Sequence, residues 1–183
     1  MTSHFVCLSD LHLGYDLSFF SDPSCHARIA GEVAEVAGGS TDYLVLNGDC
    51  LEACVPARTG EHDAAGFPAA TAEASRSFLT ALLGKLSVGE LVIVWGNHDL
   101  CLWQRLAQSC GQPVFTNNLR GDVCLLSRGH ALPGAESVLA DVLGPAALGV
   151  PRVTSAYPNY VLGRQWPFVA FHHGHLLDRM VLG

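Results

Sequence analysis

Short apolar runs alternate with longer stretches of helical periodicity along the first 110 residues of the chain. The apolar runs are rich in Val and Leu, which is typical of buried strands, and they lie at residues 5–8, 43–46 and 91–95. Apolar residues three or four positions apart predict the helices, which are expected at 25–37, 69–86 and 99–110. The strand–helix order, repeated three times, predicts an α/β fold with a parallel sheet.

The remaining third of the chain has a weaker pattern. The stretch 114–151 contains an apolar piece at 123–126 and a possible helix at 136–143, and Gly144-Pro145 and Val150-Pro151 are expected in loops. Two further strands are expected at 159–162 and 168–172, joined at Gly163-Arg164. Their pairing would form a hairpin, so this part of the sheet is expected to be antiparallel and the fold class mixed α/β (α+β).

Composition narrows the class of protein. The chain has 183 residues, 49% of them hydrophobic and 15% charged, which fits a single folded domain over 1–183. The net charge of −7 argues against binding to a nucleic-acid backbone. The seven cysteines are odd in number and irregularly spaced, which favours reduced thiols and a cytoplasmic location. The sequence shows no signal peptide and no apolar run long enough to span a bilayer.

Polar residues able to bind metal or move protons follow four of the expected strands. In a parallel sheet the carboxyl ends of the strands share one edge, where α/β proteins keep their chemistry. Each group alone is as well explained by a polar loop, an Asx turn or a helix N-cap. The residues are Asp10 and His12, then Asp49, then Asn97, His98 and Asp99, and finally His172, His173 and His175.

Together these side chains offer oxygen and imidazole donors, a set that suits Mn, Fe or Zn better than calcium. In extended backbone Asp10 and His12 would face the same side, as two ligands of one ion need. Asp49 has no partner in its own segment, and a carboxylate between two divalent ions offsets their repulsion. Two such ions would generate a bridging hydroxide able to attack phosphorus, with His98 acting on the phosphoryl group.

The ordered motifs Asp10-Leu-His12, Gly48-Asp49, Gly96-Asn97-His98-Asp99 and His173-Gly-His175 resemble those of the calcineurin-like metallophosphoesterases. The resemblance implies a four-layer αββα sandwich and two divalent metal ions. Asp10, His12 and Asp49 would hold one ion, and Asp49, Asn97 and His173 the other. His98, oriented by Asp99, would act on the phosphate, and His175 is expected to contact the substrate. The implied substrates are small phosphomonoesters, phosphodiesters or pyrophosphates.

The sequence departs from that family at one point, because no Gly-His-x-His segment follows His173. We expect a chain truncated at the C-terminus, or a natural short form, that binds metal weakly and self-associates through an unpaired strand edge. One alternative is a non-catalytic binding module on the same scaffold. Another is a mononuclear zinc hydrolase that uses His172, His173 and His175. Substrate choice is expected to depend on loops at 55–68 and 114–158.

Overall fold

A computed structural model describes residues 3–15, 18–53, 69–109, 122–127, 135–162 and 168–174. Within them a five-stranded sheet has the order β1-β2-β3-β5-β4, and β6 and β7 form a separate two-stranded sheet. The strands are β1 (Phe5–Leu8), β2 (Ser40–Asn47), β3 (Ser87–Val94), β4 (Asp122–Ser127), β5 (Arg152–Tyr157), β6 (Asn159–Leu162) and β7 (Val169–His172). The first four strands of the sheet order run parallel, and β4 is antiparallel to β5.

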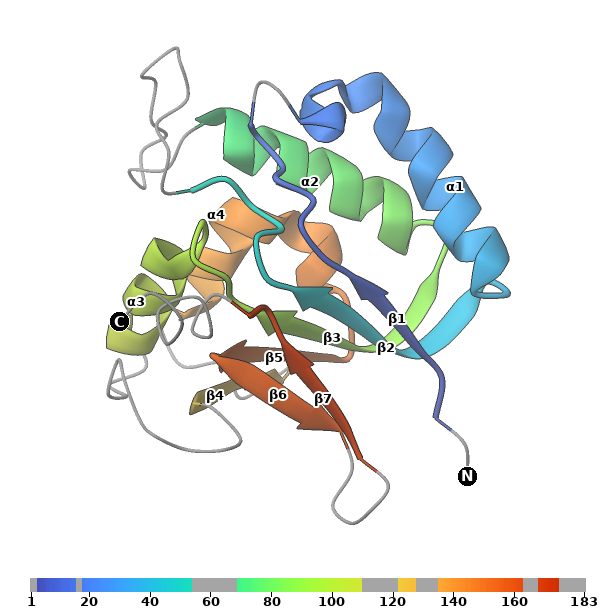
Figure 1. The fold of residues 1–183 in the computed structure, drawn as a ribbon. Helices are drawn as coiled ribbons and strands as arrows, with labels where there is room; N and C mark the ends of the chain where they lie inside the picture. Colours follow the sequence, from blue (N-terminus) through green and yellow to red (C-terminus); the bar gives the residue numbers. More distant parts are fainter. Residues whose placement is uncertain are drawn as a thin grey trace.

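Helices cover one face of the five-stranded sheet (Figure 1). The α-helices are α1 (His26–Val36), α2 (Ala69–Leu83), α3 (Leu100–Ser109) and α4 (Ala135–Leu148), and two 3-10 helices, η1 (Phe19–Ser21) and η2 (Pro23–Cys25), precede α1. α2 packs against both α1 and α4. None of the helices in the described part of the chain has the length and apolar character needed to cross a membrane.

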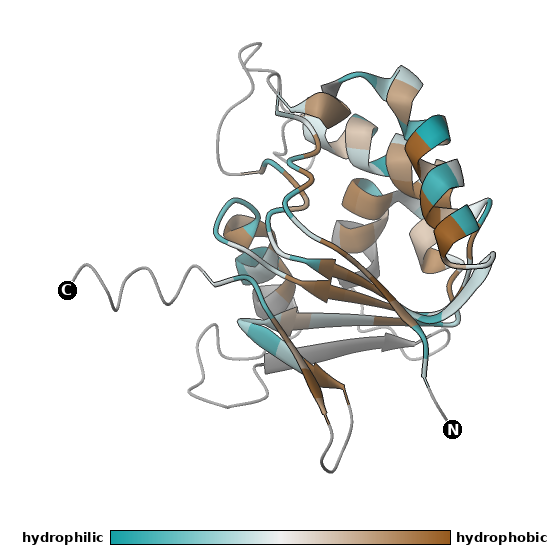
Figure 2. Cartoon of the chain, turned by 45° about the vertical axis from the view of Figure 1, so that its right-hand side comes forward, coloured by the Kyte–Doolittle hydropathy of each residue, from teal (hydrophilic) through white to brown (hydrophobic). Residues whose placement is uncertain are grey.

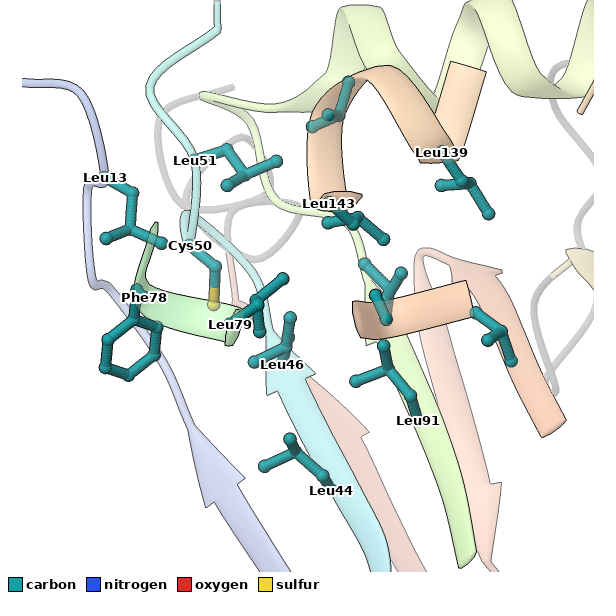
Figure 3. Close-up of a cluster of buried hydrophobic side chains, with 14 of the residues drawn as sticks. Leu13, Leu44, Leu46, Cys50, Leu51, Phe78, Leu79, Leu91, Leu139 and Leu143 are labelled. Atoms are coloured by element: carbon teal, nitrogen blue, oxygen red, sulfur yellow. The ribbon is translucent and has the colours of Figure 1, made fainter. Parts of the chain in front are cut away.

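The main core lies between the helices and the sheet. Leu44 and Leu46 of β2 pair with Leu91 and Ile93 of β3, and all four side chains point to the helical layer. Figure 3 shows such leucines meeting Phe78, Leu79, Leu139 and Leu143 of α2 and α4. Both helices present brown, apolar surface to the sheet in Figure 2, whereas the loops at the carboxyl ends of β1, β2 and β3 mix teal with brown. Apolar burial therefore fixes the sheet, and polar residues gather at the carboxyl ends of its strands.

The hairpin of β6 and β7 packs on the opposite face of the sheet (Figure 1). Val45, Val92 and Val94, which alternate with the helix-facing residues, form a second buried cluster with Phe171 of β7. Phe171 also meets Phe5 edge-on, with ring centroids 5.3 Å apart. The predicted antiparallel hairpin is confirmed, and it forms a two-stranded sheet of its own beside the five-stranded one. It forms a separate layer because Phe171 is covered by the valines of β2 and β3.

Several predicted boundaries need correction. The helix expected at 69–86 ends at Leu83, and the strand expected at 91–95 begins earlier, at Ser87. Gly144 and Pro145 were expected in a loop but lie inside α4, where Gly144 has φ 79° and kinks the helix. A left-handed glycine allows two helical segments to be joined without a separate loop.

The strand β5 was missed by the sequence analysis, which treated residues up to 158 as loop. β5 is buried along most of its length, yet it carries small and polar residues where a buried strand usually carries Val, Ile or Leu. Ser155 accepts a hydrogen bond from Trp95 Nε1 at 2.6 Å, and the Thr154 hydroxyl donates to a carboxylate oxygen of Glu90 at 2.5 Å. Side-chain hydrogen bonds to these neighbours satisfy the buried hydroxyls, so the strand forms without an apolar signature.

Candidate metal centre

The segments that follow β1, β2 and β3 are tied together by backbone hydrogen bonds. Asp10 N donates to Gly48 O at 3.1 Å and His12 N donates to Asp49 O at 3.0 Å. Ala53 N donates to His98 O at 3.1 Å, which links the second segment to the third. The prediction that these motifs share one edge of a parallel sheet is confirmed, and the edge is a hydrogen-bonded unit.

Three predicted metal ligands have left-handed backbone conformations. Asp10, His12 and Asp49 have φ of 55°, 47° and 50°, and they are the only non-glycine residues with positive φ in the described part of the chain. Asp and His are tolerated there better than most residues, but each such conformation still costs about 1–3 kcal/mol. The expectation that Asp10 and His12 lie in extended backbone was therefore wrong. The left-handed turns themselves bring the two side chains to one place.

The donor atoms of these residues converge. One ligand atom each from Asp10, His12 and Asp49 lies within 4.8 Å of the others, an arrangement that could hold a metal ion. Asp49 is 5% exposed, whereas Asp10 lies at the surface. The Ser9 hydroxyl donates to the Asp10 carboxylate and lies 2.9 Å from the carbonyl oxygen of Asn47. The three side chains thus form a donor cluster that is open on one side.

Asp49 also faces the second set of predicted ligands. Its Oδ2 lies 2.9 Å from His173 Nε2, and its Oδ1 accepts a hydrogen bond from His98 N at 2.9 Å. A Cβ atom on Gly48 would overlap the ring of His173, and one on Gly96 would overlap the Asp49 carboxylate. Glycine is required at both positions because the ligand side chains pack directly on the backbone. Asn97 is exposed in the same turn, and its role as a ligand stays a prediction.

Glu52 is a member of the site that the sequence analysis missed. Its carboxylate is 3% exposed and lies between two imidazoles. His12 Nδ1 is 3.0 Å from Oε2, and His98 Nδ1 is 2.8 Å from Oε1 and 2.9 Å from Oε2. An ionised carboxylate can only accept, so both Nδ1 atoms carry the proton and both Nε2 atoms present a lone pair in the neutral rings. The only signal in the sequence was an acid three residues after Asp49 at a strand exit.

The position of His98 agrees with a role beside the donor cluster. Its Nε2 lies 4.0 Å from Asp49 Oδ2, and its ring meets that of His12 edge-on with centroids 4.9 Å apart. Asp99 is 1% exposed, and its Oδ1 accepts a hydrogen bond from Gly96 N, which closes the turn before α3. Glu52 therefore supplies the carboxylate on His98 Nδ1, while the catalytic role of Asp99 stays a prediction.

Cys50 follows Asp49 directly but does not belong to the groups of side chains whose ligand atoms converge. Cys50 Sγ is buried and lies 3.6 Å from Gly48 O and 3.7 Å from Leu8 O. Burial, followed by the charges of Asp99 and Asp10, raises the pKa of this thiol well above its usual value. In the described residues the side chains whose ligand atoms converge are carboxylates and imidazoles, as the sequence predicts.

The last histidine motif is described only in part. His172 Nδ1 accepts a hydrogen bond from Gly174 N at 2.7 Å, which holds the turn that carries His173. His175, and with it the predicted substrate contact and the mononuclear zinc alternative, lies outside the described residues. The same holds for the whole of the loop at 55–68 and for parts of 114–158.

Comparison of the chain with protein-family models, curated proteins and solved structures found no match in any of the three. Function is therefore inferred from the geometry of this site.

Proposed function

We propose that the protein is a metal-dependent phosphoesterase that binds two divalent ions, Mn, Fe or Zn, at the edge formed by β1, β2 and β3. The observation that carries the proposal is the convergence of Asp10, His12 and Asp49 in left-handed backbone. Strained conformations persist where the surrounding structure enforces them, and they cluster at active sites and ligand clamps. Here the strain coincides with three residues whose side chains are metal ligands by type.

Charge and burial support the same proposal. Asp49 and Glu52 are buried carboxylates less than 6% exposed, and the polar side chains placed against them include His12, His98 and His173. Buried carboxylates need a positive partner, and a bound cation supplies one. Asp10, His12 and Asp49 fit one ion. Asp49 and His173, together with Asn97, are proposed to hold the second, which makes Asp49 the shared ligand.

Glu52, His12 and His98 would have different roles in the reaction. When bound, the two ions would supply a hydroxide nucleophile and polarise the phosphoryl oxygens. Glu52 holds the Nδ1 protons of His12 and His98, so that the Nε2 of His12 is available to a metal and that of His98 to the substrate. In its protonated form His98 would donate from Nε2 to a phosphoryl oxygen or to the leaving group.

The four-layer αββα sandwich belongs to the same proposal. The helical layer, the five-stranded sheet and the β6–β7 hairpin support it, and the outer helical layer stays a prediction. The substrate is proposed to be a small phosphate ester, since an acidic chain is a poor partner for a nucleic-acid backbone.

The test is hydrolysis of 4-nitrophenyl phosphate and bis(4-nitrophenyl) phosphate by the full chain supplied with Mn²⁺. We expect turnover that EDTA abolishes and added Mn²⁺ restores. Equal turnover by metal-free protein would contradict the two-ion mechanism. Metal binding with no turnover of either ester would instead favour the alternative, a binding module on the same scaffold.

A further inference from the structure

The turn that follows His12 places an aromatic ring beside the donor cluster. Tyr15 N donates to His12 O at 3.0 Å, which closes a four-residue turn through Leu13 and Gly14. Gly14 has φ 92°, and a Cβ atom there would overlap Thr71 at the start of α2. The hydrogen bond to His12 and the close packing of Gly14 on Thr71 both hold this turn, so the position of His12 determines that of Tyr15.

The ring of Tyr15 lies against the site and is open to solvent. Its centroid is 6.3 Å from that of the His12 ring, with the planes inclined by 56°, and the residue is 39% exposed. Two other exposed aromatic rings have different surroundings. Phe5 meets Phe171, and Phe19 meets Phe20. Tyr15 therefore combines exposure with contact to a proposed metal ligand.

We infer that Tyr15 contacts the organic group of the substrate and selects phosphate esters that carry a planar aromatic group. This inference rests on the proposed function of the site. A phosphoryl group bound to an ion held by Asp10, His12 and Asp49 would have its ester substituent within reach of the neighbouring ring. Aromatic groups stack on one another in offset or edge-on geometry and gain more from the contact than a small alkyl group does. The Tyr15 hydroxyl can stay hydrated, so the ring is expected to supply the selectivity.

The experiment compares binding of phenylphosphonate and methylphosphonate to the full chain loaded with Mn²⁺, by calorimetry. Both ligands carry the same charged head and neither can be hydrolysed. We expect wild-type protein to prefer phenylphosphonate about tenfold, in line with the stacking energy of one aromatic pair. Tyr15→Ala should lose the preference, and Tyr15→Phe should keep it. Phe19→Ala, which removes a ring that is 64% exposed in η1, is the matched control and should behave as wild type.

Hydrolysis provides a second readout. The ratio of variant to wild-type KM is measured for phenyl phosphate and for ethyl phosphate, so that the different reactivities of the two esters cancel. Tyr15→Ala should raise KM about tenfold for phenyl phosphate, in proportion to the lost stacking, and leave kcat for both esters within about threefold. A similar loss of kcat on both esters would show a structural role for the turn and overturn the inference.

The outcomes separate this inference from the proposed function. Wild-type protein that binds both phosphonates equally contradicts the role of Tyr15 but leaves the metal centre intact. An aromatic preference that survives in Tyr15→Ala does the same. Protein that binds neither Mn²⁺ nor either phosphonate contradicts both proposals.

Discussion

Replacing Glu52 by Gln removes one hydrogen-bond acceptor from between two imidazoles while keeping the size of the side chain. In the structure Glu52 accepts from His12 Nδ1 at 3.0 Å and from His98 Nδ1 at 2.8 Å. A Gln side chain has one acceptor oxygen, and its amide group donates. The Nδ1–H group of one imidazole would therefore face the amide donor of Gln. Alternatively, that imidazole would carry its proton on Nε2 and lose the Nε2 lone pair.

The expected magnitude follows from burial. The Glu52 side chain is 3% exposed, so water does not readily replace the lost acceptor. An unsatisfied buried donor costs about 1–3 kcal/mol, and 1.4 kcal/mol corresponds to a tenfold change in a binding constant. Loss of a group that orients a metal ligand typically weakens metal binding ~10–100-fold. We therefore expect Glu52→Gln to weaken Mn²⁺ binding by about one to two orders of magnitude.

The assay is calorimetric titration of Mn²⁺ into wild-type and variant protein, with circular dichroism to confirm folding. Glu32→Gln is the matched control, because Glu32 pairs with Arg28 on the surface of α1 at 2.6 Å and its side chain is 60% exposed. Exposed pairs contribute little, so this variant should bind Mn²⁺ as wild type does. A folded Glu52→Gln protein with unchanged affinity would refute the role given to Glu52.

Two further predictions concern close packing and pH. Gly48 and Gly38 both have positive φ, 75° and 68°, so the backbone conformation alone should cost an Ala at either position about 1–2 kcal/mol, with the overlap on His173 adding to the cost at Gly48. Only Gly48→Ala should also weaken Mn²⁺ binding, because its Cβ atom would displace His173, whereas a Cβ atom on Gly38 would meet no atom. Equal Mn²⁺ binding by the two variants would contradict the role given to His173. Burial, with the nearby Glu90 charge, raises the pKa of Tyr160 to about 12. The folded state therefore favours the neutral phenol, and the free energy of unfolding should fall as pH rises from about 10 towards 12. Urea unfolding between pH 9 and 11 should show a smaller fall for Tyr160→Phe than for wild type, and an equal fall would show that Tyr160 is not the source.

The parallel sheet could be predicted because its strands follow a simple rule. β2 and β3 carry apolar residues that are buried on both faces, β1 packs Val6 and Leu8 against the core, and each strand is followed by a helix. The hairpin of β6 and β7 was equally readable from two apolar runs. β5 was not, because Thr154 and Ser155 are buried by hydrogen bonds to Glu90 and Trp95, and such partners are distant in sequence.

The convergence of the candidate ligands could be predicted from the sequence, but the groups that support them could not. Asp10, His12 and Asp49 stand at strand exits, and the parallel order of the strands brings those exits together. Glu52 contacts His12, 40 residues away, and His98, 46 residues away, and these contacts form only in the folded chain. The left-handed backbone of the ligands was also hidden, because a local pattern of apolar and polar residues carries no information on the sign of φ.

The proposal of a two-ion phosphoesterase is tested by counting bound metal and measuring phosphoesterase rate on the same samples of wild type, Asp49→Asn and His98→Ala. Asp42→Asn, at an exposed acid of β2 whose carboxylate accepts from His4 N at 2.8 Å, serves as the control. We predict that Asp49→Asn loses both metal and rate, since it removes the shared charge. His98→Ala should keep its metal and lose ~10²–10⁴ in rate. Wild-type metal content and rate in Asp49→Asn would contradict the proposal that two ions share Asp49. Loss of metal in His98→Ala would make His98 a ligand.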